Sequence, residues 1–498
     1  MKTIATTLMA ALLAVGAAAC GGSAAVGGPG VKDPGGVKDS KGQAVTEAAA
    51  NRFKSALDAM TQHDKANDWD DAACTSTAQL FLAAAKEQGD KTFNEAVYDA
   101  GVAYQRCKKD ADAKALFKQV TDKDSKFHRA RVQLALYAFA ESGEKDVDGA
   151  LREMKQAVAD AQYQNVEALV YTAMFQMRRN SQSADDDGAN DFERARKNLQ
   201  RALAVDDTYM PAFNQLALYY LEAARQKAGR QSTRRIAIGA AKKEKKVDTQ
   251  ALDLAELVTT QAIRKSATYA PIFNTAGMIK VELGNLNSAV QAFNTARKLD
   301  PTFYEAQMNF AAVNLQFRGF EQAEEAYRAA LKMRPNDYDA HLGLALALRG
   351  GTNDANFDKS VPAAAAELDA AKKIAPDRPE AYYNDAILTQ EYKAKSGAAN
   401  NEAKLNEAKG LFGQFIQKAA SDPVFADAVK RSKERMAEID QIIAFNKQTE
   451  AERKAAEADM KQKEAEAMVK GEGEAGGGEP KPEDKPAGEP KPEDKPKP

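Results

Sequence analysis

The sequence contains few of the residues that build metal centres, redox sites or aromatic-rich cores. Three cysteines, three histidines and one tryptophan are spread over 498 residues. His63, His128 and His341 lie far apart, so they lack the spacing typical of a metal-ligand set. Aromatic residues make up only 7% of the chain, which disfavours β-barrels and β-sandwiches and favours Ala-rich helices.

Net charge and catalytic motifs are also missing. The 70 lysines and arginines nearly balance the 72 aspartates and glutamates, and the resulting formal charge of −2 argues against a dedicated nucleic-acid binder. The chain has no Gly-rich phosphate loop followed by Lys and Ser/Thr, no Cys-x-x-Cys, no His-Glu-x-x-His and no Gly-x-Ser-x-Gly. We therefore expect a protein that is not an enzyme, needs no cofactor or metal and binds no nucleic acid.

The first twenty residues have the pattern of an export signal. Lys2 precedes an apolar run from Ile4 to Ala19. As a helix this run would cover only about 24 Å, short of the roughly 30 Å core of a bilayer, so we predict a signal peptide over residues 1–19. Cys20 follows three alanines and precedes Gly21, which resembles the lipobox of bacterial lipoproteins. The resemblance implies acylation of Cys20 and location at the outer membrane, facing the periplasm.

The lipobox pattern has one departure and leaves an alternative open. The family usually carries leucine three residues before the cysteine, where this chain has Ala17. Cleavage after Ala19 without acylation would give a soluble periplasmic protein. Beyond Cys20 the chain is rich in Gly, Ser and Ala, so residues 20–43 are predicted to form a flexible linker that begins at the lipidated cysteine.

From residue 44 onward the apolar residues recur with helical spacing, and turn signals separate the helices. We predict a single array of helix pairs over residues 44–420. A closing helix that becomes highly charged is expected over 421–470. Repeated Pro, Lys and Glu then predict a disordered tail over 471–498.

Two adjacent segments share one pattern of small and aromatic residues. Residues 270–303 contain Phe273, Ala276, Gly277, Gly284, Ala289, Phe293, Ala296 and Pro301. Residues 304–337 contain Phe310, Ala311, Ala323, Tyr327, Ala330 and Pro335. This pattern resembles the tetratricopeptide (TPR) repeat, in which small residues let two helices cross closely and proline follows the second helix. The resemblance implies an all-α, superhelical solenoid of about nine antiparallel helix pairs.

A TPR solenoid exposes an extended surface of first helices that binds peptides or partner proteins. The family positions that line this groove correspond to Asn214, Leu218, Asn274, Met278, Met308 and Ala312. Solvated helix positions and core methionines would produce the same residue types, so partner contact and ordinary packing are both open for each position.

Cys74 and Cys107 are candidates for a disulfide. Their midpoint falls in the Gly89-Asp90 turn, so antiparallel helices joined there would place both thiols at the same height. Export to an oxidising compartment would allow the bond, provided the Cα atoms approach within about 7 Å. The alternative is a pair of buried free thiols.

An insertion between two predicted helices is strongly basic. Its cations are Arg225, Lys227, Arg230, Arg234, Arg235, Lys242, Lys243, Lys245 and Lys246. Such a segment fits contact with anionic headgroups, cell-wall polymer or an acidic protein surface, and equally a solvated loop. It has no aromatic residues between the cations of the kind that stack on nucleic-acid bases.

In overall layout, the exported array, the Cys20 anchor and the Pro/Lys-rich tail resemble the TPR lipoprotein of the adventurous gliding-motility machinery. That resemblance implies a non-enzymatic scaffold that joins other outer-membrane and periplasmic proteins of an envelope complex and touches the membrane through its N-terminal lipid. Two other functions stay open. One is a pilotin-like lipoprotein that assembles the secretin of a type IV pilus, and the other is a regulator of a cell-wall enzyme.

Overall fold

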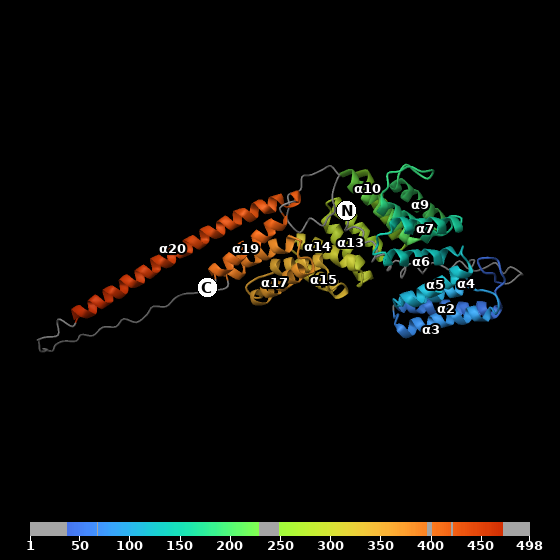
Figure 1. The fold of residues 1–498 in the computed structure, drawn as a ribbon, viewed down its shortest axis with the longest axis horizontal. Helices are drawn as coiled ribbons and strands as arrows, with labels where there is room; N and C mark the ends of the chain where they lie inside the picture. The colour runs from blue at the N-terminus through green and yellow to red at the C-terminus, as the bar shows by residue number, and fades with distance from the viewer. Residues whose placement is uncertain (1–36, 67, 229–248, 396–400, 420–421, 472–498) are drawn as a thin grey trace, which may run out of the picture. The chain divides into compact units, whose positions relative to one another are not determined.

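A computed structural model describes residues 37–66, 68–228, 249–395, 401–419 and 422–471. Over these residues the chain forms nineteen α-helices and no β-strand, so the predicted all-α class is confirmed (Figure 1). The helices of the first half are α2 (Glu47–Ala66), α3 (Asp71–Glu87), α4 (Asn94–Arg106), α5 (Asp110–Lys123), α6 (His128–Glu141), α7 (Val147–Asp160), α8 (Val166–Arg179), α9 (Asp191–Val205), α10 (Met210–Ala228) and α11 (Thr249–Lys265). They are followed by α12 (Ala270–Glu282), α13 (Leu286–Leu299), α14 (Tyr304–Gln316), α15 (Phe320–Met333), α16 (Tyr338–Gly350), α17 (Phe357–Ile374), α18 (Glu380–Glu391), α19 (Asn401–Ala419) and α20 (Ala426–Gly471).

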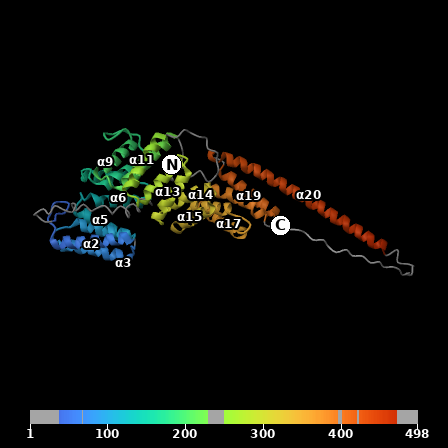
Figure 2. The same cartoon turned by 180° about the vertical axis from the view of Figure 1, so that it is seen from behind.

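The chain divides into two units, one up to Asn384 and the other from Asp385, with the boundary inside α18. In the first unit, consecutive helices pack as antiparallel pairs, from α2 with α3 to α16 with α17 (Figure 2). Each pair also packs on the next one. The predicted array extends to residue 420, beyond the point at which the first unit ends.

Small residues allow the two helices of a pair to approach closely. A Cβ atom added to Gly101 of α4 would lie 2.6 Å from the Phe117 ring of α5. The same construction at Gly277 of α12 meets the Phe293 ring of α13 at 2.5 Å. Both phenylalanines are fully buried, so the ring fills the space that a side chain on the glycine would need.

Side-chain caps begin many of these helices. Asp146 accepts a hydrogen bond from the Gly149 N–H at the start of α7, and Asn285 does the same for Ser288 in α13. Equivalent caps are made by Asp70, Asn165, Asn190 and Asp337. Each cap satisfies a backbone donor that has no partner inside the helix, so it fixes where the helix starts.

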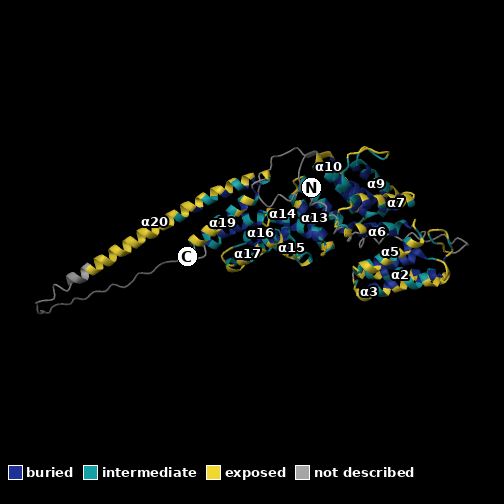
Figure 3. Cartoon of the chain, viewed as in Figure 1, coloured by how far each residue is buried: buried dark blue, intermediate teal, exposed yellow. Residues whose placement is uncertain are grey.

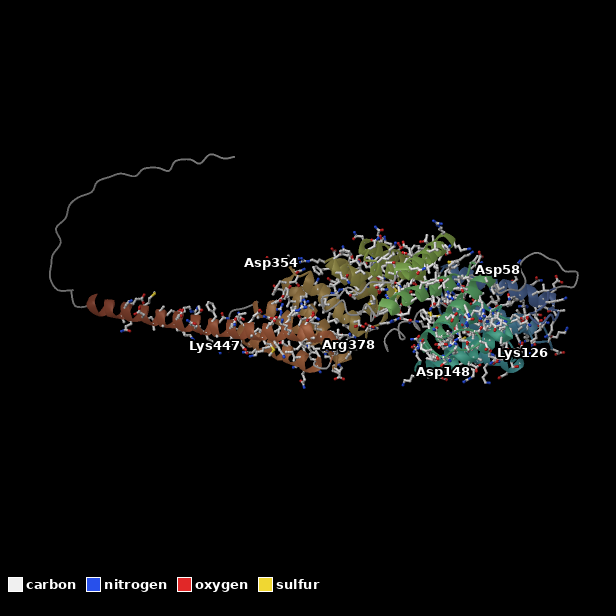
Figure 4. All side chains as sticks on the ribbon, turned by 90° about the horizontal axis from the view of Figure 1, so that it is seen from above. Asp58, Lys126, Asp148, Asp354, Arg378 and Lys447 are labelled. Atoms are coloured by element: carbon white, nitrogen blue, oxygen red, sulfur yellow. A yellow bond between two sulfur atoms is a disulfide. The ribbon has the colours of Figure 1, made fainter. Side chains whose placement is uncertain are left out.

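Arginine–tyrosine contacts close two of the helix pairs, α14 with α15 and α16 with α17. The Arg334 guanidinium lies 3.7 Å from the Tyr304 ring centroid, and Arg378 lies 3.7 Å from that of Tyr338 (Arg378 is labelled in Figure 4). Each arginine also bonds to the carboxylate of the residue after its tyrosine, at 2.9 Å. The arginine follows the second helix of one pair and the tyrosine begins the first helix of that pair, so the contact fixes the connection to the following pair.

A folded insertion separates α8 from α9. Arg194 of α9 is only 2% exposed, and its guanidinium donates to the carbonyls of Ser183 and Gly188. The same group is paired with Asp191, which is fully buried, at 2.8 Å. One buried cation therefore binds carbonyl and carboxylate groups from several residues of the 180–191 segment. The sequence of this segment indicates only that it is polar.

The chain before α2 also folds against the first unit. Residues 37–43 form a turn whose Ser40 N–H donates to the Glu95 carboxylate at 2.8 Å. Lys41 pairs with Asp124 at the end of α5, again at 2.8 Å. These residues belong to the predicted linker; the rest of that linker, Cys20 and residues 1–19 lie outside the described residues.

Cys74 of α3 and Cys107, which follows α4, are joined by a disulfide in the structure, with Cα atoms 6.2 Å apart. The neighbouring Trp69, the one tryptophan of the chain, donates its indole N–H to Asp64 at 2.9 Å. Asp64 also accepts from the guanidinium of Arg106, so this end of α4 is tied to the first helix pair by covalent and polar contacts.

In the second unit, α20 packs on α19 and then continues without a partner helix among the described residues. Most of α20 is exposed (Figure 3). Ser432 and Ile439 are nevertheless fully buried, and Lys447, labelled in Figure 4, pairs with Glu402 at 2.7 Å. From residue 448 to residue 465 every side chain is exposed. Ion pairs one turn apart, Lys454 with Glu450 and Lys463 with Asp459, support this stretch. Among the helices of the described ranges, none is long and apolar enough to cross a bilayer.

Arg194→Met should destabilise the insertion strongly. The change removes the donors to the Ser183 and Gly188 carbonyls and one of the two cations on Asp191, whose carboxylate Arg179 still contacts at 2.7 Å. Loss of buried hydrogen bonds of this kind costs about 1–3 kcal/mol. We expect faster amide hydrogen exchange over residues 180–190 and a lower urea midpoint. Arg152→Met, on the exposed surface of α7, is the control. Unchanged exchange in the insertion would show that Arg194 does not hold it.

Loss of the disulfide should weaken the N-terminal end of the array. The bonded cysteines are 33 residues apart, and closing a loop of that size stabilises by about 3–4 kcal/mol in the chain-entropy model. We expect Cys74→Ala with Cys107→Ala to lower the unfolding temperature followed by Trp69 fluorescence. Peptide mapping without reduction tests the bond directly, and recovery of both cysteines as free thiols would contradict it.

Candidate interaction surface

The first helices of successive pairs, α4 to α16 in even numbers, lie next to one another, and polar side chains join α4–α6–α8 and α10–α12–α14. In the first set, the Gln105 side chain of α4 donates to Gln133 of α6 at 3.1 Å. Gln133 in turn donates to Glu167 of α8 at 3.0 Å. Each of these two amides therefore has a hydrogen-bond partner on a neighbouring first helix.

The second set of contacts involves two of the predicted groove residues. Asn214 of α10 accepts from the Thr275 hydroxyl of α12 at 2.7 Å, and Asn274 of α12 accepts from Asn309 of α14 at 2.9 Å. We call these two contacts and the Gln105–Gln133–Glu167 chain the polar ladder. Asn214 and Asn274 therefore hold adjacent first helices in register.

The other predicted groove residues are apolar and half-buried. Leu218 and Met278 pack against the edge of the large core cluster, and Met308 packs near Tyr304 of its own helix. Ala312 is also half-buried. These side chains combine packing on one side with exposure on the other, so the structure places them on the first-helix surface without distinguishing partner contact from packing.

Comparison of helix starts reveals a regularity that the sequence had not shown. The ninth residue of each first helix from α4 to α16 is apolar, namely Val102, Leu136, Met174, Leu218, Met278, Ala312 and Leu346. We call this set the apolar row. Its four central members, from Met174 to Ala312, are half-buried, whereas Val102, Leu136 and Leu346 are buried. Met174 was not among the predicted groove residues, and the structure adds it through its place as the ninth residue of α8.

Three carboxylates gather at the N-terminal end of the same surface. Glu95 and Asp99 of α4 are 8% and 5% exposed, and Glu167 of α8 is half-buried. Arg129 of α6 lies 3.6 Å from Asp99 and 4.3 Å from the Tyr98 ring centroid. We call Glu95, Asp99 and Glu167 the acidic cluster.

Burial controls ionisation in the acidic cluster. Desolvation raises the pKa of Asp99 to about 6, with the Arg129 charge opposing the shift and Glu95 adding to it. Desolvation also raises the pKa of Glu167 above its usual range, against Arg129 and the Gln133 hydrogen bond. The second oxygen of Asp99 is buried and has no hydrogen-bond partner, which agrees with a carboxyl group that is readily protonated.

The structure reassigns the start of the predicted basic insertion. Arg225 lies within α10, and its guanidinium pairs with Glu282 of α12 at 3.0 Å, so it is not part of a basic loop. Helix α10 continues to Ala228, so Lys227 also belongs to it. Arg230, Arg234, Arg235, Lys242, Lys243, Lys245 and Lys246 lie outside the described residues.

The histidines occupy separate places in the array. His128 Nδ1 lies 2.9 Å from the amide of Asn165, and His341 Nδ1 lies 2.5 Å from the Glu367 carboxylate. Within the part of the chain that the structure covers, no three His, Cys, Asp or Glu side chains form a group that could hold a metal ion.

Comparison with known families identifies the repeat. Residues 270–303 and residues 313–379 each match a family model described as Tetratricopeptide repeat. No curated protein matches the chain.

Solved structures of TPR proteins show partial similarity. A thermophilic TPR protein from Thermus thermophilus is 22% identical, with a TM-score of 0.35, and the match covers 45% of this chain and 99% of that one. A TPR protein from Parabacteroides merdae is 13% identical, with a TM-score of 0.35, over 61% and 98% of the two chains. PilF from Pseudomonas aeruginosa is 14% identical, with a TM-score of 0.37, over 53% and 99%.

The buried Asp99 should make the N-terminal pairs less stable as pH rises. Its pKa in the folded protein, about 6, lies above the ordinary value of 3.8. The contribution of Asp99 to the free energy of unfolding is therefore greatest below about pH 4. It falls by up to about 3 kcal/mol as the pH rises through about 6. Asp99→Asn should remove this contribution from unfolding temperatures measured by Trp69 fluorescence between pH 4 and 7.5. Asp122→Asn on the exposed face of α5 is the control, and an unchanged pH slope in Asp99→Asn would contradict the assignment.

Proposed function

We propose that this TPR-repeat protein is a non-enzymatic scaffold of a bacterial envelope complex, held at the outer membrane by a lipid on Cys20 and facing the periplasm. The apolar row carries the scaffold role, because its four half-buried members repeat an equivalent position on the successive first helices α8, α10, α12 and α14. A surface built by repetition can hold one extended partner or several partners side by side. The absence of nucleotide and hydrolase motifs noted above supports a role without catalysis.

The envelope assignment rests on the export signal and on Gly21 after Cys20. Within the envelope, the layout of lipid anchor, helical array and Pro/Lys-rich tail favours a place in the gliding-motility machinery, as a subunit that links outer-membrane and periplasmic components. In this arrangement the turn of residues 37–43, which contacts Glu95 and Asp124, joins the linker to the first helix pairs.

Mild crosslinking in cells, followed by purification of the tagged full-length protein and mass spectrometry, tests this function. We expect outer-membrane and periplasmic subunits of one motility complex in stoichiometric amounts. Cys20→Ser is the matched variant: it should move the protein from the outer-membrane fraction to the soluble periplasm and abolish fatty-acid labelling.

The alternatives give different results in the same experiment. Recovery of a secretin, together with loss of its multimer in a deletion strain, would replace the scaffold with a pilotin. Recovery of a cell-wall synthase or hydrolase with altered wall cross-linking would replace it with an enzyme regulator. A Cys20→Ser protein that stays in the outer membrane would overturn the lipid anchor.

A further inference from the structure

We infer that the first-helix surface receives a partner segment in which one lysine or arginine is followed by apolar side chains. This inference rests on the proposed scaffold function and names the chemistry of the partner. It follows from the acidic cluster and the apolar row, which both lie on first helices: the first set carries carboxylates and the second carries apolar side chains.

The apolar part of the surface is centred on α8, α10 and α12. Met174, Leu218 and Met278 are the ninth residues of these helices and are all half-buried. The polar groups beside them are already used, since Asn214 and Asn274 bond to neighbouring first helices. An apolar side chain of a partner therefore meets the accessible parts of half-buried methionine and leucine side chains and does not deprive Asn214 or Asn274 of a hydrogen bond.

The acidic part of the surface is reached through Glu167. Glu95 and Asp99 are covered, and Glu167 is the half-buried member of the acidic cluster. Arg129, which is 32% exposed on its side chain, is the cation that lowers the pKa of both Asp99 and Glu167. One guanidinium thus lies among three carboxylates, and at neutral pH the remaining negative charge favours a partner cation beside Glu167.

The spacing of the two parts sets the length of the segment. Glu167 and Met174 lie seven residues apart on α8, which is about 10 Å along the helix. Packed helices lie about 8–10 Å apart, so Met174, Leu218 and Met278 span about 16–20 Å. An extended chain rises about 3.3 Å per residue and covers both distances with about eight to ten residues.

The test is selection of displayed random peptides of about twelve residues on the full-length protein, followed by binding measurements with the enriched peptides. We expect enriched peptides to carry a Lys or Arg followed by two or three apolar residues. Leu218→Glu and Met278→Glu should each weaken binding at least tenfold. Leu257→Glu is the matched control, because Leu257 is 52% exposed on the second helix α11. Circular dichroism confirms that each variant is folded.

A double-mutant cycle tests the charged contact. Glu167→Gln should weaken binding of the basic peptide about three- to tenfold, and should leave unchanged the binding of the same peptide with its basic residue replaced by glutamine. Enriched peptides that depend on Leu218 but lack a basic residue, or that ignore Glu167→Gln, would overturn this inference and leave the scaffold function standing. Peptides that bind Leu218→Glu, Met278→Glu and the wild-type protein equally would overturn the first-helix surface as a binding site altogether.

Discussion

The close crossing of the two helices within a pair is the constraint on which the array depends. At Gly101 and Gly277 the absence of a side chain lets an aromatic ring of the second helix, Phe117 or Phe293, occupy the crossing point. Because the crossing is set by direct contact, the first helix of each such pair is held at a defined position along its neighbour. Successive first helices can then meet at repeated positions: the fifth residue of α10 and of α12, Asn214 and Asn274, bonds to the sixth residue of the next first helix.

Local chemistry explains why much of this fold could be predicted from the sequence. Pro301 and Pro335 mark the ends of second helices, Asn285 and Asp337 cap the starts of helices, and the Ala/Gly/aromatic pattern identifies the crossings. All of these signals act over a few residues or within one repeat. The α17 helix shows the limit of such signals, because it begins at Phe357 and holds Pro362 inside, where proline alone suggests a later start.

The features that sequence reasoning missed depend on residues far apart in the chain. Asn214 is bonded to a residue 61 positions later, and Arg225 finds its carboxylate 57 positions later. Arg194 organises the 180–190 insertion through backbone carbonyls, which have no sequence identity of their own. Sequence reasoning could therefore assign the candidate groove to the first helices only in outline. The structure was needed to show which groove residues bond to neighbouring helices and which remain accessible to a partner.

In the first unit each helix pair packs only on its neighbouring pairs, and this arrangement has a mechanical consequence. A pull along the array passes through each pair-to-pair junction in series, so every junction carries the same load and their extensions add. The junction with the weakest contacts sets the force at which the array begins to open, whereas a greater number of pairs only lengthens its stretch. The contacts of Arg334 and Arg378 with Tyr304 and Tyr338 lie within a pair, so they resist separation of its two helices and not of neighbouring pairs. The array is thus an extensible element that yields locally while the rest of its pairs stay folded.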